Sequence, residues 1–291
     1  MGTEAYLENP PWVDRVLNKN FDSIRRRFGE EFLPIPSTSS SKKKHFEELG
    51  CGHYGCVLNT VTPGVIIKVT SDPTEAAFVT ASQQIGELPE GIVRYLGVFQ
   101  VQDEHRGRPI YVLWREEASN VGGLLSERQF SDFRRVINRL DAFKIYASYA
   151  RDTIKRSSSA SKLLTDSMRL EEWASDAVNY ERVTHLGSRF DYVAYKHEVP
   201  SHFKGAYRVA YAVQACKWIA QEMENEDIGY LVGGALGFYL EQGILLADVH
   251  ANNVGQVARP DEYTKPIWVI TDPGHMVALD PKWFDLRVPV L

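Results

Sequence analysis

Cysteine is scarce in this sequence: Cys51, Cys56 and Cys216 are the only three among 291 residues. An odd and sparse set of cysteines is a poor framework for a disulfide-rich secreted fold. We therefore expect a chain that works in a reducing, cytoplasmic compartment. The triplet Cys51-x-His53-x-x-Cys56 has metal-binding residue types. A structural zinc site usually needs four ligands, and no second pair accompanies this triplet, so we do not expect a metal there.

Long apolar runs and an excess of basic charge are also absent. Residues 1–11 show no basic stretch followed by an apolar one, so no signal peptide is predicted. The most apolar stretch, 230–247, contains Glu241 and Gln242 and predicts a buried helix followed by a strand rather than a membrane span. Acidic residues outnumber basic ones by 38 to 33, giving a net charge of −5. This balance disfavours binding to nucleic acids or to anionic membranes.

Two widespread catalytic motifs are missing as well. The sequence contains no G-x-x-x-x-G-K-[ST] stretch, which excludes a Walker-type NTPase, and no G-x-S-x-G nucleophile elbow. What the chain does have is enough apolar residues for a sizeable core, at 44% of the total, so it is not a disordered protein.

The order of the expected elements predicts an α+β protein. Short segments rich in Val, Ile, Leu, Phe and Tyr, separated by turn residues, predict a small antiparallel sheet; they are 46–50, 56–61, 64–70, 93–101 and 109–115. Helical spacing predicts the helices 74–85, 130–154, 205–223 and 228–241. Further short strands are expected at 244–246, 254–257, 268–271 and 276–279. We divide the chain into an N-terminal segment 1–45, a β-rich lobe 46–118 and a helical lobe 119–291.

The N-terminal segment contains an amphipathic helix and a linker. Apolar residues recur at helical steps over 13–28, and Ser and Lys residues fill 36–44. The favoured interpretation is that the helix packs on the lobe that follows it. The alternative is that it docks a partner protein.

The first stretch with a chemical signature is Gly50-Cys51-Gly52-His53-Tyr54-Gly55-Cys56-Val57, which fits G-x-G-x-x-G-x-V. A dinucleotide site would place a helix directly after these glycines. Here a strand, a Pro-Gly turn and a second strand ending in Ile66-Ile67-Lys68 follow instead, which is the arrangement of a nucleotide-covering hairpin. The glycines would let backbone amides approach phosphate oxygens closely.

Two further stretches lie near the C-terminus. Asp248 is followed five positions later by Asn253, directly after an expected helix and strand. Such an Asp can accept a hydroxyl proton while the Asn holds a metal ion. Asp272 stands at the end of an apolar strand and before a Gly turn, a position that suits a Mg²⁺ ligand.

Taken in order, these motifs resemble those of the protein-kinase-like superfamily, and the Asp248-x-His250-x-x-Asn253 form is similar to its aminoglycoside-phosphotransferase, choline-kinase and atypical bacterial branches. The resemblance covers a little under half of the chain. It implies a bilobal fold that binds ATP between the lobes, with Mg²⁺ or Mn²⁺, and transfers the γ-phosphoryl group to a hydroxyl. It implies a catalytic Asp248, metal ligands Asn253 and Asp272, and a phosphate-binding Lys68 paired with Glu75. The other implied nucleotide contacts are Gly50, Gly52, Gly55, Val57, Ile66, Glu116 and Glu117.

The chain also departs from the usual kinase pattern. Ala247 replaces the Arg before the catalytic Asp, so no cation is expected there to read a phosphorylated activation loop. Pro273 replaces the usual Phe, and the few residues after Asp272 leave no room for peptide-seating helices. We therefore expect an atypical serine/threonine kinase. Two alternatives stay open: a small-molecule phosphotransferase, and a pseudokinase-like binding module. The insert before the catalytic loop is nearly neutral, which disfavours a polycationic acceptor.

Overall fold

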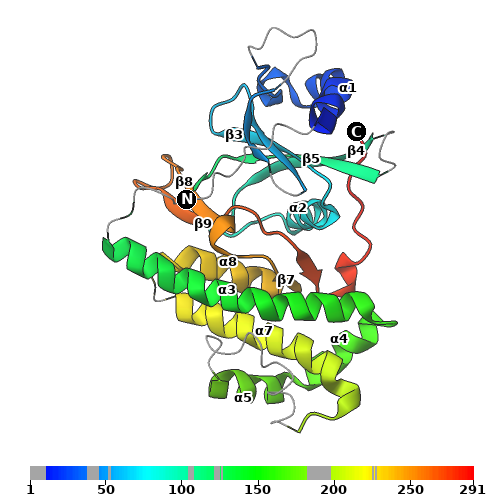
Figure 1. The fold of residues 1–291 in the computed structure, drawn as a ribbon, viewed down its shortest axis with the longest axis vertical. Helices are drawn as coiled ribbons and strands as arrows, with labels where there is room; N and C mark the ends of the chain where they lie inside the picture. The colour runs from blue at the N-terminus through cyan, green and yellow to red at the C-terminus, as the bar shows by residue number, and fades with distance from the viewer. Residues whose placement is uncertain are drawn as a thin grey trace. The chain divides into compact units, whose positions relative to one another are not determined.

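The computed structural model describes residues 11–37, 46–51, 54–103, 108–120, 125, 127–181, 198–224, 226 and 228–291 (Figure 1). Within these ranges the chain is an α+β protein that divides into two compact units. Unit 1 comprises Met1–Gly86, Val93–Ala118 and Leu286–Leu291, and unit 2 comprises Glu87–Ile92 and Ser119–Asp285. The described residues 11–37 therefore group with unit 1.

Two short segments belong to a different unit from their neighbours in the sequence, and hydrogen bonds explain both assignments. Arg259 donates to the carbonyl oxygens of Glu90 and Ile92 at 2.9 Å each, which ties residues 87–92 to unit 2. The last residues pair with a strand of unit 1, where Gln100 N–H donates to Pro289 O and Leu291 N–H donates to Gln100 O.

A five-stranded antiparallel sheet forms the centre of unit 1. Its strands are β1 (Glu48–Cys51), β2 (Gly55–Asn59), β3 (Val65–Thr70), β4 (Tyr95–Asp103) and β5 (Arg108–Glu116). The order across the sheet is β1-β2-β3-β5-β4. All five strands were predicted from the sequence to within a few residues.

Helix α1 (Pro11–Phe28) covers one face of this sheet. Its apolar stripe, with Val13, Leu17 and Ile24 fully buried, packs against strand residues that include Ile67 and Val69. The favoured interpretation of the 13–28 pattern is thus confirmed. The stripe that could have docked a partner is occupied by the sheet of its own unit.

Helix α2 (Pro73–Ile85) packs against β4 and β5 from the other side of the sheet, where Phe78 meets Tyr95 with ring centroids 6.0 Å apart. The Asp72 side chain caps its first turn by accepting from Thr74 N at 2.8 Å, and Pro73 opens the helix. Since α1 and α2 lie on opposite faces of the sheet (Figure 1), any effect of α1 on α2 has to pass through the strands between them.

Unit 2 is built mainly from helices. They are α3 (Glu127–Arg156), α4 (Ala160–Arg169), α5 (Glu171–Glu181), α7 (Lys204–Met223) and α8 (Tyr230–Glu241). Helix α3 ends two residues beyond its predicted end at 154, where a serine-rich stretch follows, and Ser159 caps α4 by accepting from Lys162 N. Helix α7 is buried along most of its length, and its Tyr211 packs on Tyr146 of α3 with ring centroids 5.0 Å apart.

Two small sheets complete unit 2 and carry the predicted catalytic loops. Strand β7 (Ile244–Leu246) pairs with β10 (Met276–Ala278), and β8 (Val254–Val257) lies between β6 (Ser119–Asn120) and β9 (Ile267–Ile270). As expected for the stretch 230–247, a buried helix is followed by a strand. Among the described helices, none has the length and apolar character needed to cross a bilayer.

Candidate functional site

The predicted partnership of Lys68 and Glu75 is present in unit 1. Lys68 Nζ lies 2.8 Å from Glu75 Oε2, and the two side chains are only 13% and 2% exposed. Successive side chains of a strand point to opposite faces of the sheet, which explains how this pair forms. Ile67 and Val69 of β3 point toward α1, so Lys68 points toward the opposite face, where α2 packs. Glu75 occupies the first turn of α2, where a carboxylate is favoured by the helix dipole.

Apolar side chains surround Lys68 on the same face of the sheet. Val57 of β2 is its direct cross-strand neighbour on one side and Leu113 of β5 on the other. Ile66, two positions before it along β3, is almost fully buried. The structure therefore brings Val57, Ile66 and Lys68, three of the implied nucleotide contacts, together on one face of the sheet.

One glycine of the glycine-rich hairpin is needed for strand packing, a role that its motif does not suggest. A Cβ atom added to Gly55 would overlap the carbonyl oxygen of Val69 and lie 2.7 Å from Thr70 Cα, so this glycine permits close pairing of β2 and β3. A Cβ added to Gly50 would meet nothing within 4 Å. Gly52 lies outside the described residues.

These two glycines give a matched pair of variants. We expect Gly55→Ala to lower the free energy of unfolding by about 1–3 kcal/mol, the usual cost of overpacking, because the β3 backbone must move. We expect Gly50→Ala to leave stability within about 0.5 kcal/mol of the wild type. Urea unfolding of both variants measures the difference. Equal stabilities would mean that the close approach of Gly55 to Val69 is not required.

A disulfide bond closes the same hairpin. Cys51 and Cys56 are opposite each other in the register of β1 and β2, and their sulfur atoms are bonded. The scarcity of cysteine predicted no disulfide framework and a reducing compartment, and this pair departs from that prediction. Because the sulfurs are bonded to each other, they offer no thiolates to a metal, although Glu48 lies close to both. Burial raises the pKa of the remaining thiol, Cys216, to about 12, so it is not a reactive cysteine.

The residues expected to meet adenine are already engaged within unit 1. Glu116 ends β5, its N–H donates to Arg94 O, and its Oε1 accepts from Arg94 N at 2.8 Å. The N–H of Glu117 donates to Gly64 O at 2.8 Å. An adenine contact at these two residues would therefore have to use acceptor groups rather than their backbone N–H donors.

In unit 2, hydrogen bonds hold the predicted catalytic loop in a fixed shape. Asp248 comes two residues after β7, and a 3₁₀ turn over Ala251–Asn253 follows it. The Asn253 side chain reaches back, and its Nδ2 donates to the backbone oxygen of Asp248 at 2.7 Å. His250 Nδ1 accepts from Asn252 N, and His250 Nε2 lies 3.8 Å from Asp248 Oδ1.

Asp272 is positioned beside this loop by the strand pairing of β8 and β9. Thr271 N–H donates to Asn253 O at 2.8 Å, so the residue before Asp272 is held against the loop. Asp272 Oδ1 accepts from Gly274 N at 3.0 Å. Gly274 has φ +56°, and a Cβ there would overlap Asp248 and lie 2.9 Å from its Oδ2. The turn after Asp272 thus packs directly on Asp248, and the three predicted residues of this unit are neighbours.

Two cations next to this loop were not predicted from the sequence. Lys144 Nζ of α3 lies 2.7 Å from Asp248 Oδ1, and Arg151 Nη1 lies 2.7 Å from His275 Nδ1. Because an arginine only donates, His275 Nδ1 is the acceptor in this contact. The sequence does contain a signal for these two cations. Along one side of the helix, the residues at helical spacing are apolar up to Leu140 and then basic at Lys144 and Arg151.

No family model matches the chain, and no significant match was found among curated proteins. The assignment of function therefore depends on the residues themselves.

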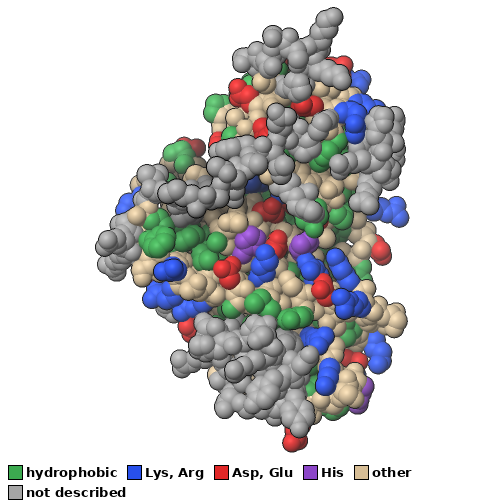
Figure 2. All heavy atoms as spheres, in the orientation of Figure 1, with side chains coloured by type: hydrophobic (Ala, Val, Ile, Leu, Met, Phe, Trp, Pro, Cys, Tyr) green, Lys and Arg blue, Asp and Glu red, His purple; other side chains and the backbone are tan. Residues whose placement is uncertain are grey.

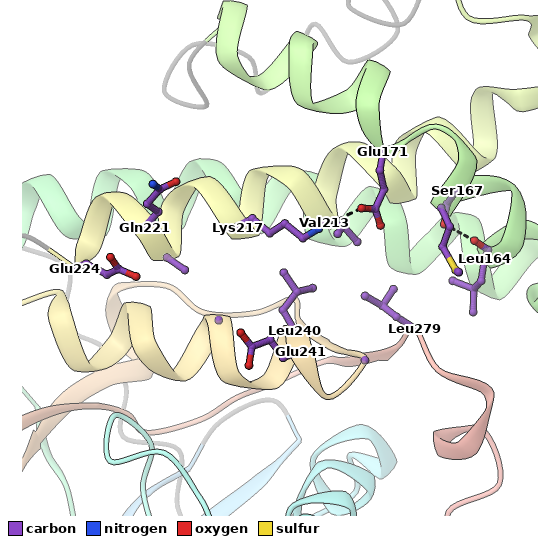
Figure 3. Close-up of a pocket in the computed structure, with 14 residues that line it drawn as sticks. Leu164, Ser167, Glu171, Val213, Lys217, Gln221, Glu224, Leu240, Glu241 and Leu279 are labelled. Atoms are coloured by element: carbon purple, nitrogen blue, oxygen red, sulfur yellow. Dashed lines mark hydrogen bonds and ion pairs between the residues drawn. The ribbon is translucent and has the colours of Figure 1, made fainter.

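A cavity of about 720 Å³ elsewhere in unit 2 is lined by none of these residues (Figure 3). Side chains of α4, α7 and α8 form its walls, with Leu164, Val213 and Leu240 among the apolar ones. Lys217 on one wall pairs with Glu171 at 3.1 Å. The predicted catalytic and metal-binding residues are thus not part of this cavity.

Proposed function

We propose that this chain is an ATP- and Mg²⁺-dependent phosphotransferase of the protein-kinase-like type, with the bilobal architecture that this implies. The observation that carries the proposal is the buried pair of Lys68 and Glu75, at 2.8 Å. The motifs required these two residues, on a strand and on the next helix, to meet. Because desolvation can cancel the attraction within a buried Lys–Glu pair, stability alone is a weak reason for such a pair. Asp248, Asn253 and Asp272, which hydrogen bonds and close packing hold next to one another, support the same assignment.

The donor atoms in unit 2 fit a hard divalent cation. Asp272 offers carboxylate oxygens and Asn253 an amide oxygen, since the Asn253 amide nitrogen is already directed at Asp248 O. Oxygen donors of this kind suit Mg²⁺ or Mn²⁺ rather than zinc. Asn253 and Asp272 would hold the ion, which when bound would neutralise charge on the phosphate oxygens.

The residues of the chain then have distinct tasks. Lys68 would bind the α- and β-phosphates of ATP, and Glu75 would keep its ammonium in place. The oxygen of the acceptor hydroxyl attacks the γ-phosphorus, the bond from that phosphorus to the β–γ bridging oxygen breaks, and ADP leaves. Asp248 orients the hydroxyl and accepts its proton. Most of the rate gain would come from positioning and charge stabilisation.

The proposal is tested with the purified full chain, γ-labelled ATP and Mg²⁺, incubated alone and with lysate fractions of proteins or small molecules. We expect transfer of label, and a loss of about 100-fold or more in Asp248→Asn, because the amide cannot accept the proton. Nucleotide binding without any transfer would favour the pseudokinase-like alternative. Failure to bind nucleotide would overturn the proposal.

The metal assignment has its own test. We expect ATP to bind more tightly as Mg²⁺ is added, and this dependence to disappear in Asp272→Ala, because a hard oxygen ligand is lost. Asp261→Ala is the matched control, since Asp261 is an exposed carboxylate in a turn of the same unit. Titration calorimetry with and without Mg²⁺ gives both affinities. If Asp272→Ala keeps the full Mg²⁺ dependence, the metal site lies elsewhere.

A further inference from the structure

The second half of α3 carries a line of polar and basic side chains. Lys144, Ser148, Arg151 and Lys155 follow one another at steps of four, three and four residues, which places them on one side of the helix. Earlier on the same side the helix has Ile137 and Leu140, which are buried. The side of α3 that begins as part of the core therefore continues as a basic stripe.

This basic stripe lies against the predicted catalytic loop. Lys144 contacts Asp248 at 2.7 Å, and Arg151 contacts His275 at 2.7 Å. The His275 backbone oxygen accepts from Ala247 N, so His275 adjoins the residue before Asp248. The Lys144 side chain is 37% exposed and that of Arg151 is 21% exposed, so solvent reaches both.

Positive charge dominates this part of the helix. Residues 144–156 contain the cations Lys144, Arg151, Lys155 and Arg156 and a single carboxylate, Asp152, whose Oδ1 lies 3.1 Å from Arg151 Nε. Figure 2 shows Lys and Arg side chains gathered over this half of α3. Lys144 contacts the Asp248 carboxylate, and this carboxylate would accept the proton of the acceptor hydroxyl. A hydroxyl that reaches Asp248 therefore also comes close to Lys144.

We propose that Lys144 and Arg151 form an anion-binding subsite, and that the acceptor is a small hydroxy compound that carries a phosphate or carboxylate group. This inference rests on the proposed function and specifies its substrate class. The ammonium of Lys144 acts as a point charge, and the guanidinium of Arg151 offers several N–H donors to an oxyanion. A polycationic acceptor would meet repulsion at the same place.

Binding of inorganic phosphate tests the subsite without any need for turnover. Phosphate is titrated into the full chain and into Lys144→Met/Arg151→Met, Lys68→Met and Lys162→Met, the last being an exposed lysine on α4. We expect the double variant to bind phosphate at least about 10-fold more weakly, because two cations are lost. Lys162→Met should bind it like the wild type, and Lys68→Met shows whether phosphate binds at the proposed nucleotide site instead. No binding to the wild type, an unchanged double variant, or a loss confined to Lys68→Met would overturn the proposal.

Transfer of label tests the acceptor class directly. A small-molecule extract is passed over anion-exchange or cation-exchange resin before incubation with the protein and γ-labelled ATP. We expect the anion-exchange treatment to remove the acceptor and the cation-exchange treatment to leave it, and the double variant to raise the KM for the acceptor more than it lowers kcat. Glycerol 3-phosphate and glycerate, each compared with glycerol, separate phosphate from carboxylate recognition. Label on proteins alone, or on a neutral or cationic compound, would contradict an anionic acceptor. If phosphate binds as expected but no transfer occurs under any condition, the proposed function fails and the anion subsite stands.

Discussion

Replacing Lys68 with Met is expected to lower phosphoryl transfer by about three orders of magnitude or more, because no other group of β3 can place the phosphates. The same change should also destabilise the protein. The Glu75 side chain is 2% exposed, and removing the cation of a buried pair typically costs about 3–5 kcal/mol. Loss of activity in this single variant would therefore not by itself identify a catalytic role.

A double variant separates the two effects. In Lys68→Met/Glu75→Gln both charges are removed, so much of the lost stability should return, whereas turnover should stay low. Lys19→Met, an exposed lysine of α1 in the same unit, serves as the control and should change neither quantity. Urea unfolding and ATP turnover are measured on each protein. A double variant with near-normal turnover would refute the role of Lys68, and one as unstable as the single variant would refute the cost assigned to Glu75.

The elements that the sequence predicts best are those with a strong local pattern. The break after α3 has a cap at Ser159, and the start of α2 has Asp72 and Pro73, so both boundaries were predicted to within a residue or two. The pairing of Lys68 with Glu75 was predicted from the resemblance to protein kinases, and the structure gives its physical basis. A strand of known register fixes the side of Lys68, and a short connection leaves the next helix little choice of face.

The features that were missed depend on contacts between residues far apart in the chain. In the sequence, Lys144 and Asp248 are separated by the described helices α4, α5, α7 and α8 and by a segment outside the described residues. No local pattern specifies which side of α3 faces Asp248. The disulfide was missed for a different reason. The number of cysteines in a chain indicates whether disulfides hold the whole fold together. It does not predict a single bond such as Cys51–Cys56, which depends only on the register of one hairpin.

Deleting residues 1–40 is expected to unfold unit 1 rather than merely weaken it. Helix α1 buries five large apolar side chains against the sheet: Trp12, Val13, Val16, Leu17 and Ile24. At about 1.5–3 kcal/mol each before entropy is subtracted, their burial is comparable with the whole stability of a typical domain. Thermal unfolding of the truncated and full chains measures the effect. Equal melting temperatures would make α1 a passive tail.

A point variant decides whether α1 also sets the Lys68–Glu75 pair. Leu17→Ala should cost about 2–5 kcal/mol, because Leu17 is fully buried, and Arg15→Ala, on the exposed side of α1, should cost about 0.5 kcal/mol or less. Helix α1 touches Ile67 and Val69, which flank Lys68 along β3, and it lies across the sheet from α2. Any influence on Glu75 must therefore pass through the position of β3. If α1 sets the pair, Leu17→Ala lowers kcat even at temperatures where the protein stays folded. If α1 only contributes stability, the folded fraction of Leu17→Ala turns over ATP at the wild-type rate.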